Sequence, residues 1–447
     1  MRDPDASLHM DELTVVRELR EPLPDVHFLR SDLARQWTRS DMLVEFELRD
    51  ALSVVAPRLP FVSQPSEWCD AQLHAAAELT LRLQKEAVAA GYDLKDAPAS
   101  NVIFAGTCPV FCDLMSFVPL REKKWWAAGQ FARHFVLPLA LARLRGLHAH
   151  HLLQTWRDGV PPDVASRLLG PGRFMTRFWP LVAGGGAGSG NTSKRYESGK
   201  EGESGEAIAR FRAALHSSLA WMLAGARPKP SPKAEPGADW QGYAEHRPHY
   251  DTHSLTLKRR QVGEWLNRLK PGWVADFGCN TGEFSRMALE AGANVVALDA
   301  DHDSVQRLFS AGLASKRLHP VVATLDDLRG GRGWAGTEFP GLAQRLEHRF
   351  DLVMMLALVH HLAVAAAVPL DEVARFAAKC TRRWLVVEWI DQADPQLQLL
   401  CARRQRNVSD FSADRQRAAF QRAGFQIETE LGLGATVRTL ALLQKSR

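Results

Sequence analysis

The chain carries the stretch VADFGCNTGE at residues 274–283. Its apolar beginning predicts a buried strand, and Gly278 and Gly282 predict a turn that opens a helix at Glu283. Glycines let the backbone come close to a ligand, and a helix N-terminus offers free N–H groups to an anion such as a carboxylate. This stretch therefore predicts a ligand site at the point where a strand passes into a helix.

Strand-like and helix-like segments alternate from residue 273 onward. The predicted strands cover 273–277, 294–298, 321–323, 351–356 and 384–390, and predicted helices begin at Glu283, Asp303 and Leu370. Such alternation with apolar strands predicts a mostly parallel sheet covered by helices. The last segments, 425–430 and 436–443, are expected to form an antiparallel pair that closes the sheet. The expected fold class is therefore α/β, with a Rossmann-like, mostly parallel seven-stranded sheet.

Asp276 lies in the first of these predicted strands, and a second acidic residue, Asp299, directly follows the predicted strand 294–298. An acidic side chain at that place can accept hydrogen bonds from both hydroxyls of a ribose, as in dinucleotide-binding folds. A glycine loop alone is weak evidence, because several kinds of nucleotide cofactor use one, and a nicotinamide-binding domain remains the structural rival. The glycine loop and the acidic strand end together are more specific.

In chain order, Asp276, Gly278, Gly282 and Asp299 resemble motifs I and II of class I S-adenosylmethionine-dependent methyltransferases. Asn280 stands where many members carry a central glycine, but asparagine tolerates left-handed backbone better than most residues, so the loop is expected to be preserved. The resemblance spans roughly residues 250–443 and implies S-adenosylmethionine as the cofactor. It implies these cofactor-binding residues: Asp276, Gly278, Cys279, Asn280, Thr281, Gly282, Asp299, Ala300, Thr324, Asp326 and Leu356.

Two further stretches carry the same resemblance. The segment FDLVMMLALVHHL, residues 350–362, resembles the family's fourth strand and the loop after it, where the transferred methyl group usually lies. The segment HPVVATLD, residues 319–326, resembles the end of the third strand, whose polar residue usually meets the adenine amine. Thr324 and Asp326 are both candidates for that contact.

The donor's leaving group is a neutral thioether, so the protein mainly has to hold nucleophile, methyl and sulfur in line. An acceptor that must lose a proton can use a positioned base, and His360, His361 and Glu388 are the candidates. One of two adjacent histidines usually points into the core or caps a helix instead. Glu388 lies in the apolar strand LVVEWI, where an unpaired carboxylate is costly, so it is expected to have a partner or a site to face. No metal site is predicted.

Composition predicts three parts: an N-terminal module at 1–183, mainly helical or α+β; a flexible Gly/Pro-rich linker with one helix at 184–240; and the methyltransferase domain at 241–447. The run GGGAGSGNTSKRYESGKEGESG and the proline-rich run RPKPSPKAEPGAD mark the linker. Such glycine, serine and charge cannot bury enough apolar surface to offset the entropy of ordering.

The N-terminal half holds a second, fainter pattern in LKDAPASNVIF, residues 94–104, and PVFCD, residues 109–113. Asp96, Asn101 and Asp113 resemble the catalytic loop and metal-binding aspartate of kinases and aminoglycoside phosphotransferases, which implies a base and two metal ligands. The first 60 residues show no glycine-rich phosphate loop and no convincing strand lysine. The alternative is that Asp96 and Asn101 shape a turn and Asp113 caps a helix.

The bulk numbers fit a soluble globular protein, with 46% hydrophobic and 24% charged residues. The 56 basic and 51 acidic residues are spread without a block of like charge, so solvated surfaces are favoured over an anionic partner. Six cysteines without a secretory signal predict reduced thiols and a cytoplasmic location. No membrane span is predicted, nucleic acid is not indicated, and the oligomeric state is left open.

The order of motifs along nearly the whole chain resembles a bacterial group of nodulation-type, NoeA-like methyltransferases. The predicted function is methyl transfer to a small-molecule or glycan-related acceptor, with the N-terminal module recognising the acceptor. The alternatives are an RNA or protein methyltransferase, although no RNA-binding module is recognised, and a bifunctional protein with a kinase-like N-terminal domain.

Overall fold

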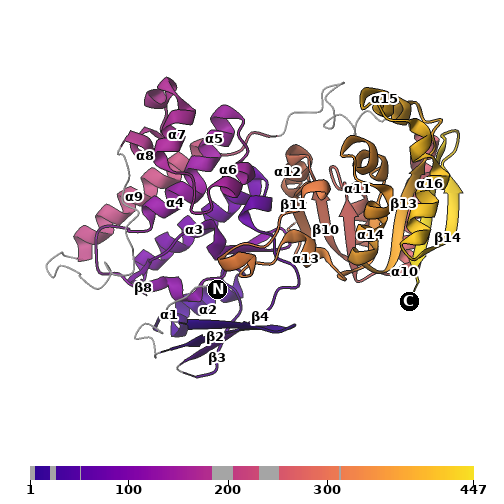
Figure 1. The fold of residues 1–447 in the computed structure, drawn as a ribbon. Helices are drawn as coiled ribbons and strands as arrows, with labels where there is room; N and C mark the ends of the chain where they lie inside the picture. Colours follow the sequence, from indigo (N-terminus) through magenta and orange to yellow (C-terminus); the bar gives the residue numbers. More distant parts are fainter. Residues whose placement is uncertain are drawn as a thin grey trace. The chain divides into compact units, whose positions relative to one another are not determined.

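A computed structural model describes residues 6–20, 27–50, 52–183, 205–230, 251–311 and 314–446. The chain divides into two compact units, Met1–Pro230 and Ser231–Arg447 (Figure 1). Residues 184–204 and 231–240 of the predicted linker lie outside the described residues. No described helix combines the length and the apolar composition that a bilayer crossing requires.

The described residues of the second unit form a seven-stranded sheet in the order β11-β10-β9-β12-β13-β15-β14. The first five strands of this order are parallel to one another, and β15 is antiparallel to both β13 and β14. The sheet is therefore mixed, and its last two strands, β15 and β14, form an antiparallel pair at one edge. The strands are β9 (Trp273–Phe277), β10 (Asn294–Asp299), β11 (Leu318–Val322), β12 (Phe350–Met355), β13 (Thr381–Ile390), β14 (Phe425–Gly432) and β15 (Arg438–Lys445).

Helices follow the parallel strands, and several begin at residues that cap their free N–H groups. Asp251 accepts a hydrogen bond from the backbone N–H of Ser254, and Asp301 accepts from those of Asp303 and Ser304. Such caps stabilise a helix start by about 1 kcal/mol. The helices are α10 (Thr252–Leu269), α11 (Glu283–Glu290), α12 (His302–Ser310), α13 (Leu342–Leu346), α14 (Leu370–Cys380), α15 (Pro395–Arg403) and α16 (Ala413–Arg422).

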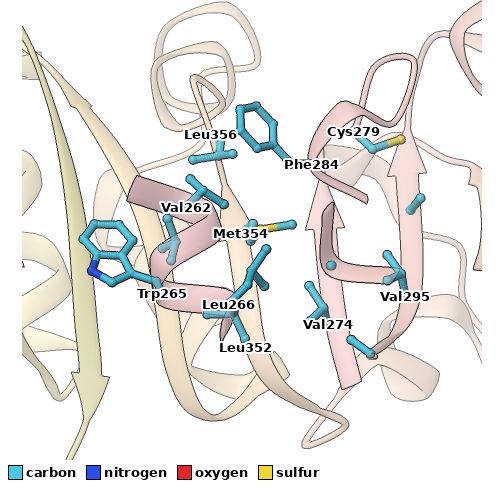
Figure 2. Close-up of a cluster of buried hydrophobic side chains, with 14 of the residues drawn as sticks. Val262, Trp265, Leu266, Val274, Cys279, Phe284, Val295, Leu352, Met354 and Leu356 are labelled. Atoms are coloured by element: carbon cyan, nitrogen blue, oxygen red, sulfur yellow. The ribbon is translucent and has the colours of Figure 1, made fainter. Parts of the chain in front are cut away.

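The core of this unit joins α10 and α11 to the central strands. Val262 and Leu266 of α10 pack with Val274 of β9 and Met354 of β12, and Phe284 of α11 and Leu356 belong to the same cluster (Figure 2). Strands β9, β10 and β12 are buried over most of their length, so they are continuously apolar and do not alternate.

Strand β11 differs from the predicted strand because it begins at Leu318, three residues earlier than expected, and includes Pro320. It is the edge strand of the sheet, next to β10 alone. Proline removes a donor from the ladder, and an edge strand has one side on which that donor is not needed. A proline within a strand run is therefore compatible with this position.

The first unit is α+β. Its described strands include a four-stranded antiparallel sheet in the order β1-β2-β4-β3 and two smaller pairs, β5-β8 and β6-β7. The strands are β1 (Ala6–Met10), β2 (Thr14–Leu19), β3 (Glu47–Leu48), β4 (Ser53–Pro57), β5 (Tyr92–Leu94), β6 (Val102–Ala105), β7 (Cys108–Phe111) and β8 (Phe117–Pro119). The helices are α1 (His27–Arg30), α2 (Asp32–Arg39), α3 (Asp70–Ala89), α4 (Ala128–Phe131), α5 (Leu137–Arg145), α6 (Ala149–Thr155), α7 (Pro162–Leu169), α8 (Trp179–Ala183) and α9 (Gly205–Gly225).

Helix α9 corrects the predicted linker, because it belongs to the first unit and packs against α3. Its Arg212 is fully buried and donates a hydrogen bond of 2.6 Å to Asp93. The same guanidinium also donates to the backbone oxygens of Glu122 and Lys124. A buried cation with a carboxylate and two carbonyl acceptors fixes a helix in place, so this segment is structured and part of the first core.

Candidate active site

The turn after β9 is built from left-handed backbone. Gly278, Asn280 and Gly282 have φ values of 73°, 49° and 78°. The expectation that asparagine would take a left-handed conformation in this loop is confirmed, and the Asn280 Oδ1 accepts the N–H of Thr281 at 2.8 Å. The N–H groups of Gly278 and Cys279 both donate to the Leu298 oxygen of β10. The turn is therefore tied to the neighbouring strand before it enters α11.

The two acids that define the site lie at the carboxyl ends of adjacent parallel strands. Asp276 pairs in register with Ala297, so Asp299 lies two residues beyond that pair on the same edge of the sheet. Asp276 is buried and accepts a hydrogen bond of 2.6 Å from the Ser285 hydroxyl. Asp299 accepts the N–H of Asn280 at 2.7 Å and that of Asp301 at 2.9 Å, so it also anchors the turn.

Burial sets the electrostatics of both carboxyl groups. It raises the pKa of Asp276 to about 6, the Ser285 hydrogen bond opposes this, and the charge of Asp299 adds to it. Burial also raises the pKa of Asp299, against hydrogen bonds from backbone N–H groups. Two acids with raised pKa values at one strand edge are typical of a functional site.

A pocket lies at this edge of the sheet, lined by residues from the turn after β9, from the start of α11, from α10 and from the loop after β12. Six predicted cofactor residues line it: Asp276, Gly278, Cys279, Asn280, Thr281 and Leu356. Four lining residues were not predicted: Lys258, Glu283, Phe284 and Ala357. The other predicted site residues are not among its lining: Gly282, Asp299, Ala300, Thr324, Asp326, His360, His361 and Glu388.

Gly282 does not line the pocket and has a packing role. It is the N-cap of α11, and a Cβ atom there would come within 2.4 Å of Leu308. Its place in the motif is therefore explained by the close packing of α11 against α12.

Lys258 is the most consequential residue that sequence reasoning missed. It is buried on α10, and its Nζ donates to the Glu388 Oε2 at 2.6 Å. The signal that could have found it is a lysine four residues before Val262 on the apolar side of a helix, because a buried lysine requires a partner.

Glu388 has the partner that its apolar surroundings require. Its second oxygen lies 3.5 Å from Arg438, which in turn donates to Asp394 at 2.8 Å. Lys258, Glu388, Arg438 and Asp394 are all buried. Both oxygens of the Glu388 carboxylate therefore face buried cations, and Glu388 does not line the pocket. The geometry therefore favours positioning of Lys258 over the predicted role of a base.

The paired histidines follow β12. Leu356 and Ala357 line the pocket, while His360 is buried and His361 half-buried just beyond them, at the start of a short π-helix, η9 (His361–Ala365). Their ring centroids lie 3.9 Å apart. A Cβ atom on Gly278 would lie 3.2 Å from Leu358, so this loop packs against the glycine turn.

Thr324 and Asp326 follow β11 and are both exposed. They belong to a short turn beside the strand end that carries Asp299, since the N–H of Ala323 donates to the Asp299 backbone oxygen at 2.9 Å. Ala300 is also exposed, directly after Asp299. The cofactor contacts of Thr324, Asp326 and Ala300 stay predictions.

In the first unit, two of the three phosphotransferase-like residues come together. The Asn101 amide lies 3.4 Å from one oxygen of Asp113, and the Ser116 hydroxyl donates to that oxygen at 2.6 Å. The other oxygen of Asp113 accepts from Arg17 of β2 at 3.0 Å. Asp96 contributes its backbone oxygen, 3.5 Å from the Asn101 amide. Asp113 also accepts the N–H of Met115 and caps the following turn, as the structural alternative expects.

Comparison with known proteins agrees with the fold of the second unit. Residues 232–430 match the family model described as "Methyltransferase domain". The protein is thus a class I S-adenosylmethionine-dependent methyltransferase, an enzyme whose cofactor is S-adenosylmethionine. Over 403 residues it is 29% identical to nodulation protein NoeA from Rhizobium meliloti strain 1021, an alignment that covers 87% of this chain and 81% of that protein.

Solved structures similar to parts of this chain include magnesium protoporphyrin IX methyltransferase from Synechocystis PCC 6803, with 17% identity, a TM-score of 0.31, and coverage of 43% of this chain and 80% of that one. Another is the N-methyltransferase NodS from Bradyrhizobium japonicum WM9, with 13% identity, a TM-score of 0.31, and coverage of 42% and 97%.

Proposed function

We propose that this enzyme transfers the methyl group of S-adenosylmethionine to a small-molecule or glycan-related acceptor in the cytoplasm. One observation carries the proposal: Asp276, the left-handed turn at Gly278 and Asp299 meet at the carboxyl ends of two adjacent parallel strands, above the N-terminus of α11. Ligands of open α/β sheets bind at that edge. The donor supplies an activated methyl group, and the chain supplies binding and alignment.

The pocket and the neighbouring strand end offer complementary groups to the methionine and ribose parts of the donor. Lys258 and the positive end of the α11 helix dipole give positive potential for the methionine carboxylate. Asp276 faces the same pocket and suits the methionine ammonium. Asp299 lies at the next strand end and suits the ribose hydroxyls. The close approach of ligand to backbone is permitted by the missing side chain of Gly278.

On the acceptor side, the loop after β12 carries His360 and His361 three and four residues after Ala357, which lines the pocket with Leu356. An imidazole is a side chain suited to take a proton from a hydroxyl or amine as the methyl group is transferred. Glu388 acts through Lys258 and is a positioning residue in this proposal.

The acceptor class is tested by incubating the enzyme with tritiated S-adenosylmethionine and three acceptor pools: neutral and acidic oligosaccharides with small hydroxyl and amine compounds, total tRNA, and a protein extract. The chain has 56 basic and 51 acidic residues, and this near balance does not indicate an extended basic surface for binding a polyanion such as tRNA. We expect label in the first pool. Label confined to tRNA or protein would replace this proposal by the RNA or protein alternative.

Donor binding is expected to depend on pH through Asp276. Its pKa of about 6 means that the carboxylate loses its charge as the pH falls below that value, so affinity for S-adenosylhomocysteine falls, about tenfold by pH 5. Calorimetry from about pH 5 to 8 measures this, and Asp276→Asn should bind weakly with a flat profile. An unchanged pH profile in this variant would remove Asp276 from the site.

The raised pKa of Asp276 affects folding stability in the opposite direction to donor affinity. Between about pH 4 and 6 the folded state holds a proton on Asp276 that the unfolded chain has released. The contribution of this group to folding stability therefore falls as the pH rises through that window, while donor affinity increases.

Substitution of Gly278 by leucine is expected to weaken S-adenosylhomocysteine binding at least tenfold. The new Cβ meets Leu358, and the longer side chain has to enter the pocket that Gly278 lines. Gly292→Leu is a matched control, because Gly292 also has a positive φ, but a Cβ atom there would have nothing within 4 Å and the residue does not line the pocket. Both variants carry about 1–2 kcal/mol of backbone strain. Equal affinity losses in the two would mean that strain alone is responsible.

We propose that the first unit transfers no phosphoryl group. Magnesium requires oxygen ligands in near-octahedral geometry, whereas the Asp113 carboxylate is already neutralised by Arg17. We expect calorimetry with ATP and magnesium to give no binding to the wild type. Magnesium-dependent ATP binding that Asp113→Ala abolishes would restore the bifunctional alternative, provided that the control Asp163→Ala, which removes an exposed acid of α7, leaves that binding intact.

A further inference from the structure

A second cavity of about 410 Å³ lies in the methyltransferase unit and shares no lining residue with the donor pocket. Its lining comes from η9 and the start of α14 on one side, and from the segment after α15 and helix α16 on the other. Five charged residues line it: Asp371, Arg406, Asp410, Arg415 and Arg422. The remaining lining is mainly apolar and includes Val368, Leu370 and Phe411.

The lining holds one more cation than anions. Arg422 pairs with Asp371 at 2.8 Å, and Arg415 lies 3.7 Å from Asp410. The exposed Arg406 guanidinium forms no ion pair or side-chain hydrogen bond with any residue that the structure describes. Arg415 at 3.7 Å from its partner is held only loosely, so two guanidinium groups are available to a ligand.

The start of α14 adds to this positive potential. This helix of 11 residues begins at Leu370 in the lining, and its N-cap, Pro369, has no side chain that accepts a hydrogen bond from the first turn. The two acids of that turn, Asp371 and Glu372, pair with Arg422 and Arg375. The positive end of the helix dipole therefore points at the cavity that Arg406 borders.

We propose that this cavity is a binding site for a sugar-sized molecule that carries a phosphate or a carboxylate group. Arginine binds both groups through paired, charge-assisted hydrogen bonds, and a cavity of this volume holds more than an inorganic ion. The apolar lining packs against the carbon skeleton. The chain from Leu356 to Leu370 borders both cavities, so the ligand contacts the segment that continues from the donor pocket.

The test is calorimetry of the full-length protein with glucose 6-phosphate, glucuronate and glucose as probes. We expect at least one of the two anionic sugars to bind at least tenfold more tightly than glucose, and the stronger of the two identifies the group. The double variant Arg406→Gln/Arg415→Gln should lose at least tenfold in that affinity. Arg403→Gln/Arg404→Gln is the matched control, with the same change of charge on neighbouring residues outside the lining.

Binding of neither anionic sugar more tightly than glucose would overturn the proposal, and so would equal losses in the two double variants. S-adenosylhomocysteine is titrated into the same proteins. Unchanged donor affinity shows that the double variants are folded, and failure of the wild type to bind S-adenosylhomocysteine would count against the proposed methyl transfer without bearing on this site.

Discussion

Replacement of Asp299 by alanine is expected to weaken the binding of S-adenosylhomocysteine by about 100-fold. A hydrogen bond to a charged group contributes about 1.5–3 kcal/mol, and two ribose hydroxyls would lose such an acceptor. Even the lower figure, counted twice, corresponds to about a factor of 100 in affinity. The variant also loses the acceptor of the Asn280 N–H, which ties the glycine turn to β10. Calorimetry with wild type and variant measures the loss.

Two controls separate ribose recognition from damage to the turn. Asp299→Asn keeps an oxygen for the Asn280 N–H and removes the charge, so it should fall between wild type and Asp299→Ala. Asp327→Ala removes an exposed acid near the next strand end, outside the pocket lining, and should bind as the wild type does. Affinity of Asp299→Ala within threefold of wild type would mean that Asp299 does not hold the ribose.

The part of the site predicted from sequence is the part that is local in sequence. β9 has the predicted bounds, and α11 and α14 begin at the predicted residues, because an apolar strand run, a glycine turn and a helix start are encoded within a few neighbouring positions. The left-handed backbone of Asn280 could also be predicted, because the tolerance of a positive φ is a property of the residue type itself.

The part that was missed depends on charges that meet across the chain. Lys258 and Glu388 are 130 residues apart, and Arg212 and Asp93 are 119 apart. Buried charges require partners, but the sequence does not say which of the many lysines, arginines and acids will meet. This explains why the sequence predicted a partner for Glu388 without identifying Lys258, and why α9 was assigned to the linker.

The Arg17–Asp113 pair shows the same limit for a motif. The spacing of Asp96, Asn101 and Asp113 does bring Asn101 and Asp113 together, because a short hairpin, β6-β7, separates them. The arginine that neutralises Asp113 comes from a strand 96 residues away. A local motif thus predicts local geometry, whereas its chemistry depends on what the remaining fold places against it.

Removal of Glu388 alone is expected to cost about 3–5 kcal/mol in the free energy of unfolding of the methyltransferase unit. Glu388→Leu leaves Lys258 buried without its carboxylate, and an uncompensated buried charge carries a cost of this size. The double variant Lys258→Met/Glu388→Leu should regain most of the lost stability. It removes both charges of the pair together, and Arg438 keeps its hydrogen bond to Asp394. Chemical denaturation, with hydrogen exchange at β12 and β13 amides to report on this unit, measures both. Additive losses in the double variant would mean that the pair is not coupled.

The isosteric Glu388→Gln separates the two roles that this residue has been given. If Glu388 positions Lys258, the amide releases the ammonium from its charged partner, so S-adenosylhomocysteine affinity and stability both fall. If Glu388 is a base, donor affinity stays unchanged and methyl transfer alone is lost, with the disappearance of an acidic limb from its pH profile. We expect the first outcome, because both oxygens of Glu388 face buried cations and neither lines the pocket.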